Sequence, residues 1–206
     1  MIIMHEEDSK IRMLSREYCV LELDPETVCE LDMGCGSGSF TAALAARYPK
    51  RHILAADVML GRLRKVVKRL DKSGSSDWEV LRVEARMLIG RMLPDSSLDR
   101  IHLLCPDPWP KGRHRGHRLL ASDFTAALHR VLKADGIFHF SSDDTNYCRA
   151  VEEVMTQSRL FASAPDGAAD LADVKSDFEL KWLAEGKTVK HLTWRKLPLP
   201  PHTVGH

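Results

Sequence analysis

The stretch VCELDMGCGSG, residues 28–38, decides the fold of this chain. Its first six residues, 28–33, form an apolar run that predicts a strand. Three glycines at alternate positions follow and predict a tight loop, because glycine accepts positive φ and lets a ligand approach the backbone closely. The alanine-rich segment 39–48 predicts a helix that stops at Pro49. The stretch is therefore the first strand–loop–helix unit of an α/β domain.

Strand and helix patterns keep alternating after this unit. The further strands are predicted over 52–56, 79–83, 101–105, 137–141 and 189–197, and the further helices over 60–70, 86–92, 122–132 and 146–157. The segments 73–76, 94–97 and 135–136 predict turns, and 162–175 predicts a loop. This alternation indicates a single α/β domain with a doubly wound, mostly parallel sheet and helices on both faces. We expect it to span 28–197, after a lead-in over 1–27 with a short helical piece and before a proline-rich tail over 198–206.

Composition narrows the class of protein. The chain has 206 residues, of which 44% are hydrophobic and 29% charged, as in ordinary single-domain proteins. A net charge of +1 excludes a uniformly basic nucleic-acid binder, so such binding must come from local patches. Five scattered cysteines without a C-x-x-C pair argue against zinc and a disulfide framework. The early acidic N-terminus and the lack of a membrane-length apolar run predict a cytoplasmic protein.

Carboxylates follow the successive predicted strands. They lie at or just past the strand ends, and they are Asp32, Asp57, Glu84, Asp107 and Asp143. Ligands of doubly wound sheets bind outside the carboxyl ends of the strands, so these side chains should share one edge. We therefore expect the functional site there.

The glycine loop indicates which ligand this edge binds. The nicotinamide fingerprint G-x-G-x-x-G fails, because Ser39 stands where the third glycine is required. Asp32 directly before the loop suits a cation, and Asp57 is placed to accept both hydroxyls of a ribose. Glu84 would lie near an adenine amino group. Together with Gly34 and Gly36, these acids predict a site for S-adenosylmethionine.

A second distinctive stretch lies in the middle of the chain. PDPWPK, residues 106–111, is followed by the basic run GRHRGHR, residues 112–118. Three prolines exclude a helix or a central strand, so the segment should hold the carboxylate of Asp107 in a stiff loop. The basic run attracts polyanions such as nucleic acid. Five basic residues on the predicted helix 60–70 are better explained as a solvated face.

These motifs together identify a family. The chain resembles the bacterial tRNA (guanine-N7)-methyltransferases from about Asp32 to Leu197. The most specific part is PDPWPK at 106–111, with Arg113-His114 and Arg118-Leu119 behind it. Further matches are Ser142-Asp143 with Tyr147, and SDFE at 176–179, where the family carries Thr-x-x-Glu. The resemblance implies a Rossmann-like class I methyltransferase fold, S-adenosylmethionine as methyl donor, and the variable-loop guanosine 46 of tRNA as acceptor.

The resemblance also implies roles for single residues. The implied cofactor contacts are Asp32, Gly34, Gly36, Asp57, Glu84 and Asp107, with Asp107 also catalytic. The implied guanosine contacts are Lys111, Asp143, Ser176, Asp177, Phe178 and Glu179. We expect Arg113, Arg115 and Arg118 to hold tRNA phosphates. The chain departs from the family pattern by aspartate for glutamate at 32 and 57, by Ser176 for threonine, by Gly112 and Gly116 within the basic run, and by a short acidic lead-in.

Other interpretations stand beside these. A methyltransferase for a small molecule or another RNA would keep the glycine loop but would not need the basic run. A non-catalytic RNA-binding module would not need the acids, and Ser39 argues against a nicotinamide oxidoreductase. Taken alone, Ser176-x-x-Glu179 is better explained as a helix capping box. His114 and His117 lack a third ligand, so no metal is expected, and His102 and His139 are expected to be satisfied strand residues. No obligate protein partner is implied, and the oligomeric state and the set of tRNA substrates stay open.

Overall fold

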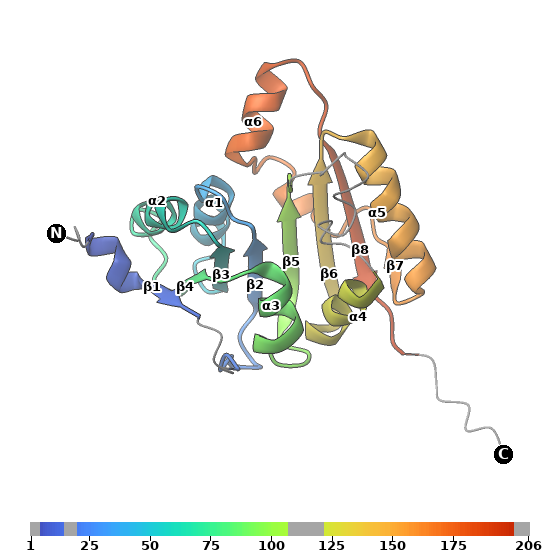
Figure 1. The fold of residues 1–206 in the computed structure, drawn as a ribbon, viewed down its shortest axis with the longest axis horizontal. Helices are drawn as coiled ribbons and strands as arrows, with labels where there is room; N and C mark the ends of the chain where they lie inside the picture. The colour runs from blue at the N-terminus through green and yellow to red at the C-terminus, as the bar shows by residue number, and fades with distance from the viewer. Residues whose placement is uncertain (1–4, 15–19, 107–121, 200–206) are drawn as a thin grey trace.

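The computed structural model describes residues 5–14, 20–106 and 122–199 (Figure 1). Within these ranges the strands are β1 Ile11–Met13, β2 Cys29–Met33, β3 His52–Asp57, β4 Trp78–Arg82, β5 Leu98–Leu104, β6 Leu132–Ser142, β7 Phe161–Ser163 and β8 Lys190–Lys196. The α-helices are α1 Ser39–Arg47, α2 Leu60–Leu70, α3 Ala85–Met87, α4 Ser122–Val131, α5 Thr145–Ser158 and α6 Asp177–Ala184. The other helical segments are the 3-10 helices η1 Glu6–Lys10 and η4 Ala169–Leu171 and the π-helix η2 Leu88–Met92.

The strands form an eight-stranded sheet in the order β1-β4-β3-β2-β5-β6-β8-β7. The strands from β1 to β6 pair in parallel, whereas β8 runs antiparallel to β6 and to β7. The chain moves outward in one direction from β2 to β4 and in the other from β5 to β6. The order therefore reverses between β2 and β5, and this is where doubly wound sheets bind ligands. The predicted doubly wound, mostly parallel fold is confirmed.

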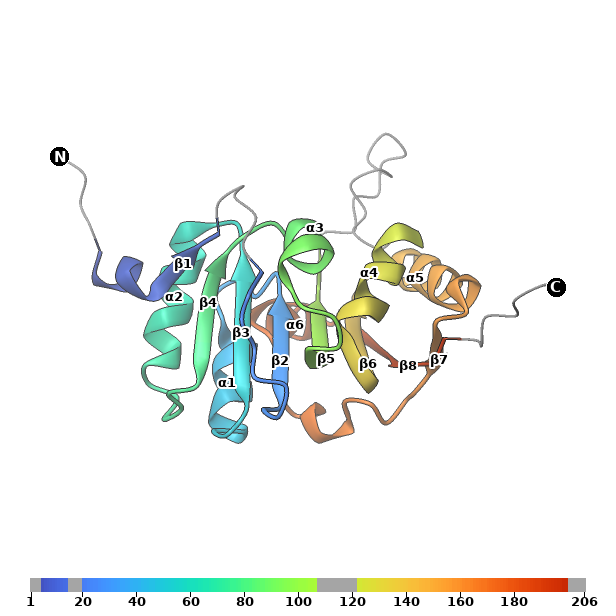
Figure 2. The same cartoon turned by 90° about the horizontal axis from the view of Figure 1, so that it is seen from below.

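Two apolar clusters cover the two faces of the sheet (Figures 1 and 2). On one face α1 and α2 bury Leu44, Leu63 and Val67 against β3 and β4. On the other face α4 and α5 bury Leu128 and Val151 against β2, β5 and β6. A mostly parallel sheet is apolar on both faces, so helices have to cover both faces to remove its side chains from water. Each helix packs its single apolar stripe against the sheet.

The charged face of α2 has partners within the chain. Arg64 donates to Asp8 at 2.7 Å, and Lys68 lies 3.3 Å from Glu7, both on the η1 turn. Arg69 Nη1 donates to Asp177 Oδ2 at 2.8 Å. Much of the positive charge on this helix is therefore paired with other segments of the protein.

Several elements differ from the sequence prediction. The range of β6 includes Asp135-Gly136, where a turn was predicted. Residues 133–136 nevertheless have no partner on β5 or β8, since the register passes from Leu98 opposite Leu132 to Arg100 opposite Ile137, and Asp135 takes a φ of 59°. The predicted turn residues therefore form an irregular bulge within the strand. The helix predicted over 86–92 is confirmed, but its type changes along the segment, from the α-helix α3 to the π-helix η2. Part of the lead-in, β1, joins the sheet beside β4. In the described ranges, no helix combines the length and apolarity needed to span a membrane.

Candidate functional site

Four of the five predicted acids lie at one edge of the sheet. Asp32 is the penultimate residue of β2, Asp57 ends β3, Glu84 follows β4 by two residues, and Asp143 directly follows β6. These strands run parallel, so their carboxyl ends face the same side. Asp107 lies outside the described residues. The common edge predicted from the sequence is present for the four acids that the structure describes.

Asp32 is a buried carboxylate, with 3% of the residue exposed. Thr41 on α1 donates its hydroxyl proton to Asp32 Oδ2 at 2.5 Å. Burial raises the pKa of Asp32 to about 6, and the nearby charge of Asp57 adds to this, while the bond from Thr41 and the charge of His102 oppose it. A cation entering beside Asp32 would remove the energetic penalty on its ionised form.

The glycine loop leaves backbone open beside Asp32. Gly34 has a φ of 75°, and a Cβ there would meet no atom within 4 Å. Gly38 has a φ of 81°, and a Cβ there would lie 2.8 Å from Cγ2 of Val66 on α2. Gly38 therefore lets α1 and α2 pack closely, whereas Gly34 keeps space that a ligand can fill.

Backbone groups hold Asp57 in place. Its Oδ2 accepts a hydrogen bond from the N–H of Gly36 at 3.2 Å, and its Oδ1 accepts one from the N–H of Met59 at 2.8 Å. Arg62 lies 3.8 Å from the same carboxylate. Each oxygen keeps a free lone pair for a hydroxyl donor. The glycine loop thus also orients the acid on the next strand.

Glu84 lies along the same edge and is exposed. Its Oε2 accepts a hydrogen bond from the N–H of Met87 at 3.0 Å and so caps α3. A surface hollow beside it is lined by Met13, Leu14, Val58, Arg82, Val83 and Glu84. The apolar walls and the single carboxylate of this hollow suit a flat heterocycle with an amino group.

The start of α6 closes the pocket over the glycine loop. The pocket is lined by Asp32, Gly34, Cys35, Gly36, Ser37, Ser39, Phe40, Leu104, Ser176, Asp177 and Phe178. Ser37 donates to Asp177 Oδ2 at 2.6 Å, and the N–H of Asp177 donates to Ser39 Oγ at 2.7 Å. With the Arg69 ion pair, these bonds clasp α6 to the loop. The roles of Asp177 and Phe178 toward guanosine stay predictions, since here both residues face the glycine loop.

Ser176 and Glu179 make different kinds of contact in the structure. Ser176 Oγ accepts a hydrogen bond from the N–H of Glu179 at 3.2 Å, so Ser176 is the N-cap of α6. The Glu179 carboxylate does not complete a capping box. It pairs instead with Lys175 at 2.8 Å and with His191 at 3.0 Å, and only 2% of the residue is exposed. Burial raises the pKa of Glu179, but the bonds from His191 and Lys175 outweigh it and leave the pKa below its ordinary value.

The remaining predicted residues are unevenly covered by the structure. Asp143 is partly buried, with Lys187 Nζ 3.4 Å from its Oδ2. Lys111, Arg113, Arg115 and Arg118 lie outside the described residues, so their roles stay predictions. The described residues contain no group of three or more His, Cys, Asp or Glu side chains arranged to hold a metal ion.

Sequence reasoning missed the residues that support the acids. Thr41 bonds Asp32 from α1, and Lys175 and His191 hold Glu179 from two separate segments. Only Thr41 had a sequence signal, its position on the helix directly after the glycine loop. His191 lies on β8, and nothing in the sequence of that strand indicates a contact with a buried carboxylate.

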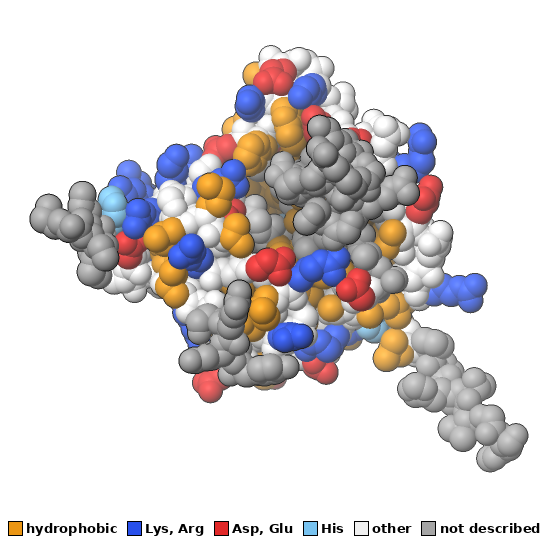
Figure 3. Space-filling view, in the orientation of Figure 1, with side chains coloured by type: hydrophobic (Ala, Val, Ile, Leu, Met, Phe, Trp, Pro, Cys, Tyr) orange, Lys and Arg blue, Asp and Glu red, His pale blue; other side chains and the backbone are white. Residues whose placement is uncertain are grey.

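α6 stands over the carboxyl edge of the sheet (Figure 1). Its exposed large apolar side chains are Phe178, Leu180 and Leu183, and apolar surface gathers over this helix in Figure 3. The helix thus presents one side to the pocket and another to solvent. The site thus combines the buried carboxylate of Asp32 and the open glycine loop with the backbone-bound carboxylate of Asp57 and the apolar hollow beside Glu84. This arrangement fits the cationic amino acid, ribose and adenine parts of S-adenosylmethionine.

Comparisons with known proteins identify the family of the chain. The family model described as "Putative methyltransferase" matches residues 26–192. The tRNA (guanine-N(7)-)-methyltransferase of Geobacter metallireducens is 35% identical over 170 residues, which cover 81% of this chain and 81% of the relative. That of Thermotoga maritima is 29% identical over 184 residues, which cover 85% of this chain but 59% of the relative's length.

A solved structure supports the fold alone. The crystal structure of the 16S rRNA methyltransferase KamB matches with a TM-score of 0.62 at 17% identity, over 85% of this chain and 89% of that chain. The breadth of the family match and the identity to relatives decide the family. The chain belongs to the family of tRNA (guanine-N(7)-)-methyltransferases, with a Rossmann-like class I fold and S-adenosylmethionine as its methyl donor.

Proposed function

We propose that this chain transfers the methyl group of S-adenosylmethionine to N7 of guanosine 46 in the variable loop of tRNA. The observation that carries the proposal is Asp32, a buried carboxylate with a pKa raised to about 6, next to open backbone at Gly34. Such a group favours a positively charged ligand. The names of the curated relatives supply the tRNA guanine, and a tRNA substrate agrees with the cytoplasmic location expected from the sequence.

Four groups of the chain would hold the cofactor. Asp32 would face its positive charge, and Gly34 and Gly36 would let its amino acid part lie against the backbone. Asp57, already oriented by the N–H groups of Gly36 and Met59, would accept the ribose hydroxyls. Glu84 would face the adenine amino group at the rim of the apolar hollow. When bound, the cofactor supplies a methyl group on a sulfonium, which is activated toward attack by a lone pair.

The reaction requires that the guanosine be correctly oriented, but it does not require a general base to remove a proton. N7 of guanine carries its own lone pair at neutral pH, so placement and electrostatics should supply most of the rate. We assign Asp107 and Asp143 to the guanine N1–H and amino groups, with Asp107 as the catalytic residue. Ser176 and Glu179, with Asp177 and Phe178 between them, would close the base from the side of α6.

The tRNA body would bind through the basic loop. Lys111, Arg113, Arg115 and Arg118 would contact phosphates and make binding dependent on salt. Because N7 lies within a folded tRNA, the base would be splayed out to reach the pocket, as in other base-modifying enzymes.

The test is methyl transfer from labelled S-adenosylmethionine to an unmodified tRNA transcript, followed by nucleoside analysis. Label in 7-methylguanosine, lost when guanosine 46 alone is replaced by adenosine, is the expected result. Label in 7-methylguanosine that persists after this replacement would keep the reaction but overturn the position. Cofactor binding without label in tRNA would indicate a small-molecule or another RNA acceptor.

A further inference from the structure

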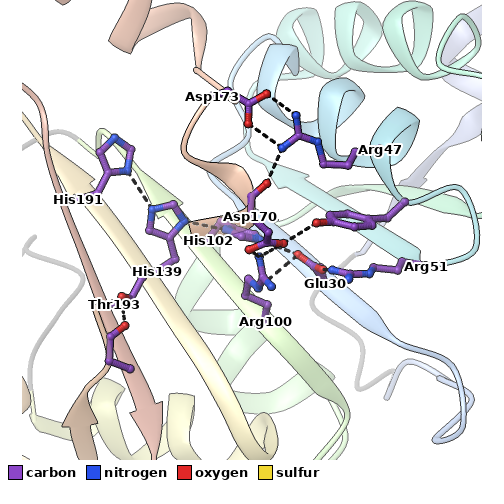
Figure 4. Close-up of polar contacts among 12 residues, drawn as sticks. Glu30, Arg47, Arg51, Arg100, His102, His139, Asp170, Asp173, His191 and Thr193 are labelled. Atoms are coloured by element: carbon purple, nitrogen blue, oxygen red, sulfur yellow. Dashed lines mark hydrogen bonds and ion pairs between the residues drawn. The ribbon is translucent and has the colours of Figure 1, made fainter. Parts of the chain in front are cut away.

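A continuous chain of hydrogen bonds crosses the sheet and ends at Glu179. Its members are Glu30 on β2, His102 on β5, His139 on β6, His191 on β8 and Glu179 on α6. Figure 4 shows the central part, in which the three imidazoles follow one another across neighbouring strands. The links are Glu30 to His102 at 2.9 Å, His102 to His139 at 3.0 Å, His139 to His191 at 2.9 Å, and His191 to Glu179 at 3.0 Å.

Strand register explains why these side chains meet. His102 lies directly opposite His139 in the pairing of β5 with β6. His191 lies opposite Ser141, two residues from His139 on the same face of the sheet. The order β2-β5-β6-β8 therefore carries the chain from one strand to the next until it leaves the sheet at α6.

Proton counting gives the chain a defined charge. Each of the four links needs one proton, and three neutral imidazoles carry only three between them. Both end groups accept, because the pKa of Glu30 and that of Glu179 lie below their ordinary values. Four complete links therefore require a fourth proton, which makes one imidazole an imidazolium.

The fourth proton belongs at an outer imidazole. Burial, together with the charges of His102 and His191, lowers the pKa of His139 well below its ordinary value. His102 and His191 each face a carboxylate, which His139 does not. One end of the chain is sealed, because Glu30 and His102 are 0% exposed and Glu30 also pairs with Arg51 and Arg100.

The other end is open to solvent. The His191 side chain is 31% exposed, and a hollow lined by Pro165, Ala168, Ala169, Leu171, Ala172 and Thr193 with His139, His191 and Lys175 reaches the chain. The charged groups that face this end are Glu179 on α6 and Lys175 just before it, while Asp32 acts on His102 from β2. Solvent therefore reaches the histidine chain at His191.

We propose that His191 is a positioning residue for the methyl transfer proposed above: through the shared proton of the histidine chain it holds the Glu179 carboxylate in the orientation that receives guanosine. Glu179 sits two residues after Asp177, which the glycine loop clasps, so the carboxylate cannot follow α6 freely. His191 and Lys175 then decide where its oxygens point.

The experiment compares His191→Leu, which removes the link, with His191→Gln, whose amide N–H replaces the Nε2 donor. The expected result is a fall in kcat/KM for tRNA of about tenfold to a hundredfold in His191→Leu. His191→Gln should recover most of this loss, and the Kd for S-adenosylmethionine should stay within about twofold in both. His129→Gln is the matched control, because His129 is also buried but bonds the carbonyl of Leu197 at 2.7 Å, away from this chain.

One further readout separates positioning from mere stability. The double variant His191→Leu with Glu179→Gln should lose no more than Glu179→Gln alone.

The outcomes are distinguishable. Equal losses in His191→Leu and His129→Gln, or additive losses in the double variant, would each overturn the positioning role while leaving the methyl transfer intact. Wild type that transfers no methyl group to tRNA guanosine would overturn the proposed function and the positioning role together.

Discussion

Cofactor binding should weaken at acid pH, because a protonated Asp32 offers no charge to a cation. The pKa of this buried carboxyl is raised to about 6. A ligand that binds only the ionised form has to displace the proton, so its apparent Kd rises as pH falls through that pKa. The sign is fixed by the raised value: a carboxyl with an ordinary pKa would stay ionised across the same range.

The magnitude follows from the same pKa. At about pH 7 nearly all of Asp32 is ionised, and at about pH 5 about one tenth of it is. The Kd for S-adenosylmethionine should therefore rise about tenfold between these conditions, a loss of about 1.4 kcal/mol of binding free energy. Titration calorimetry across this range, at constant ionic strength, measures the change directly.

Two variants make the measurement specific. Asp32→Asn should bind the cofactor weakly at every pH and remove the dependence, since no proton has to leave. Asp166→Asn is the matched control, because Asp166 is an exposed carboxyl on the loop after β7 and should leave the tenfold change intact. A Kd that stays flat in wild type, or a pH dependence that survives in Asp32→Asn, would refute the role assigned to this residue.

Three further predictions concern stability and catalysis. Glu30→Gln should lower the free energy of unfolding by about 3 kcal/mol, because it leaves partly buried Arg100 and buried His102 without their carboxylate. The pKa of Glu30 is about 2 against an ordinary 4.5, so this difference, read from urea midpoints, is complete above about pH 4.5 and lost as pH falls toward 2. Gly38→Ala should lower the free energy of unfolding, measured by thermal unfolding, by about 1–3 kcal/mol, because the new Cβ would lie 2.8 Å from Val66 on a backbone with positive φ. A changed Kd for the cofactor without any loss of stability would contradict a packing role. Asp107→Ala should abolish turnover while tRNA binding in a filter assay survives, and near-normal rates would show that the mechanism is wrong.

Local sequence patterns predicted the long elements well. The helix predicted over 60–70 matches α2 because four buried apolar residues recur at helical spacing. β1 and β7 were missed, since three residues are too few to show an alternating pattern. The turn expected at Asp135-Gly136 is a bulge within β6: these residues have no partner on β5 or β8, but Leu132 before them and Ile137 after them both pair with β5, so the strand resumes beyond them.

The histidines show most clearly what the sequence pattern does not predict. In the sequence, His102 and His139 look like ordinary strand residues with satisfied nitrogens. In the structure they are satisfied by each other, with Glu30 as the second partner of His102 and His191 as the second partner of His139, 52 residues away along the chain. Nothing in the spacing of these residues encodes that β8 pairs with β6.

The sequence by itself determined the fold class, the shared edge of the strand-end acids and the family, because those depend on local periodicity, on short loop motifs and on the handed connection of parallel strands. The tertiary structure alone decided that Asp32 is desolvated, that α6 is clasped onto the glycine loop, and that Glu179 is held by a proton-sharing chain. Those properties arise from which distant strands become neighbours and from how much water the packing excludes, and both are set only when the whole sheet is assembled.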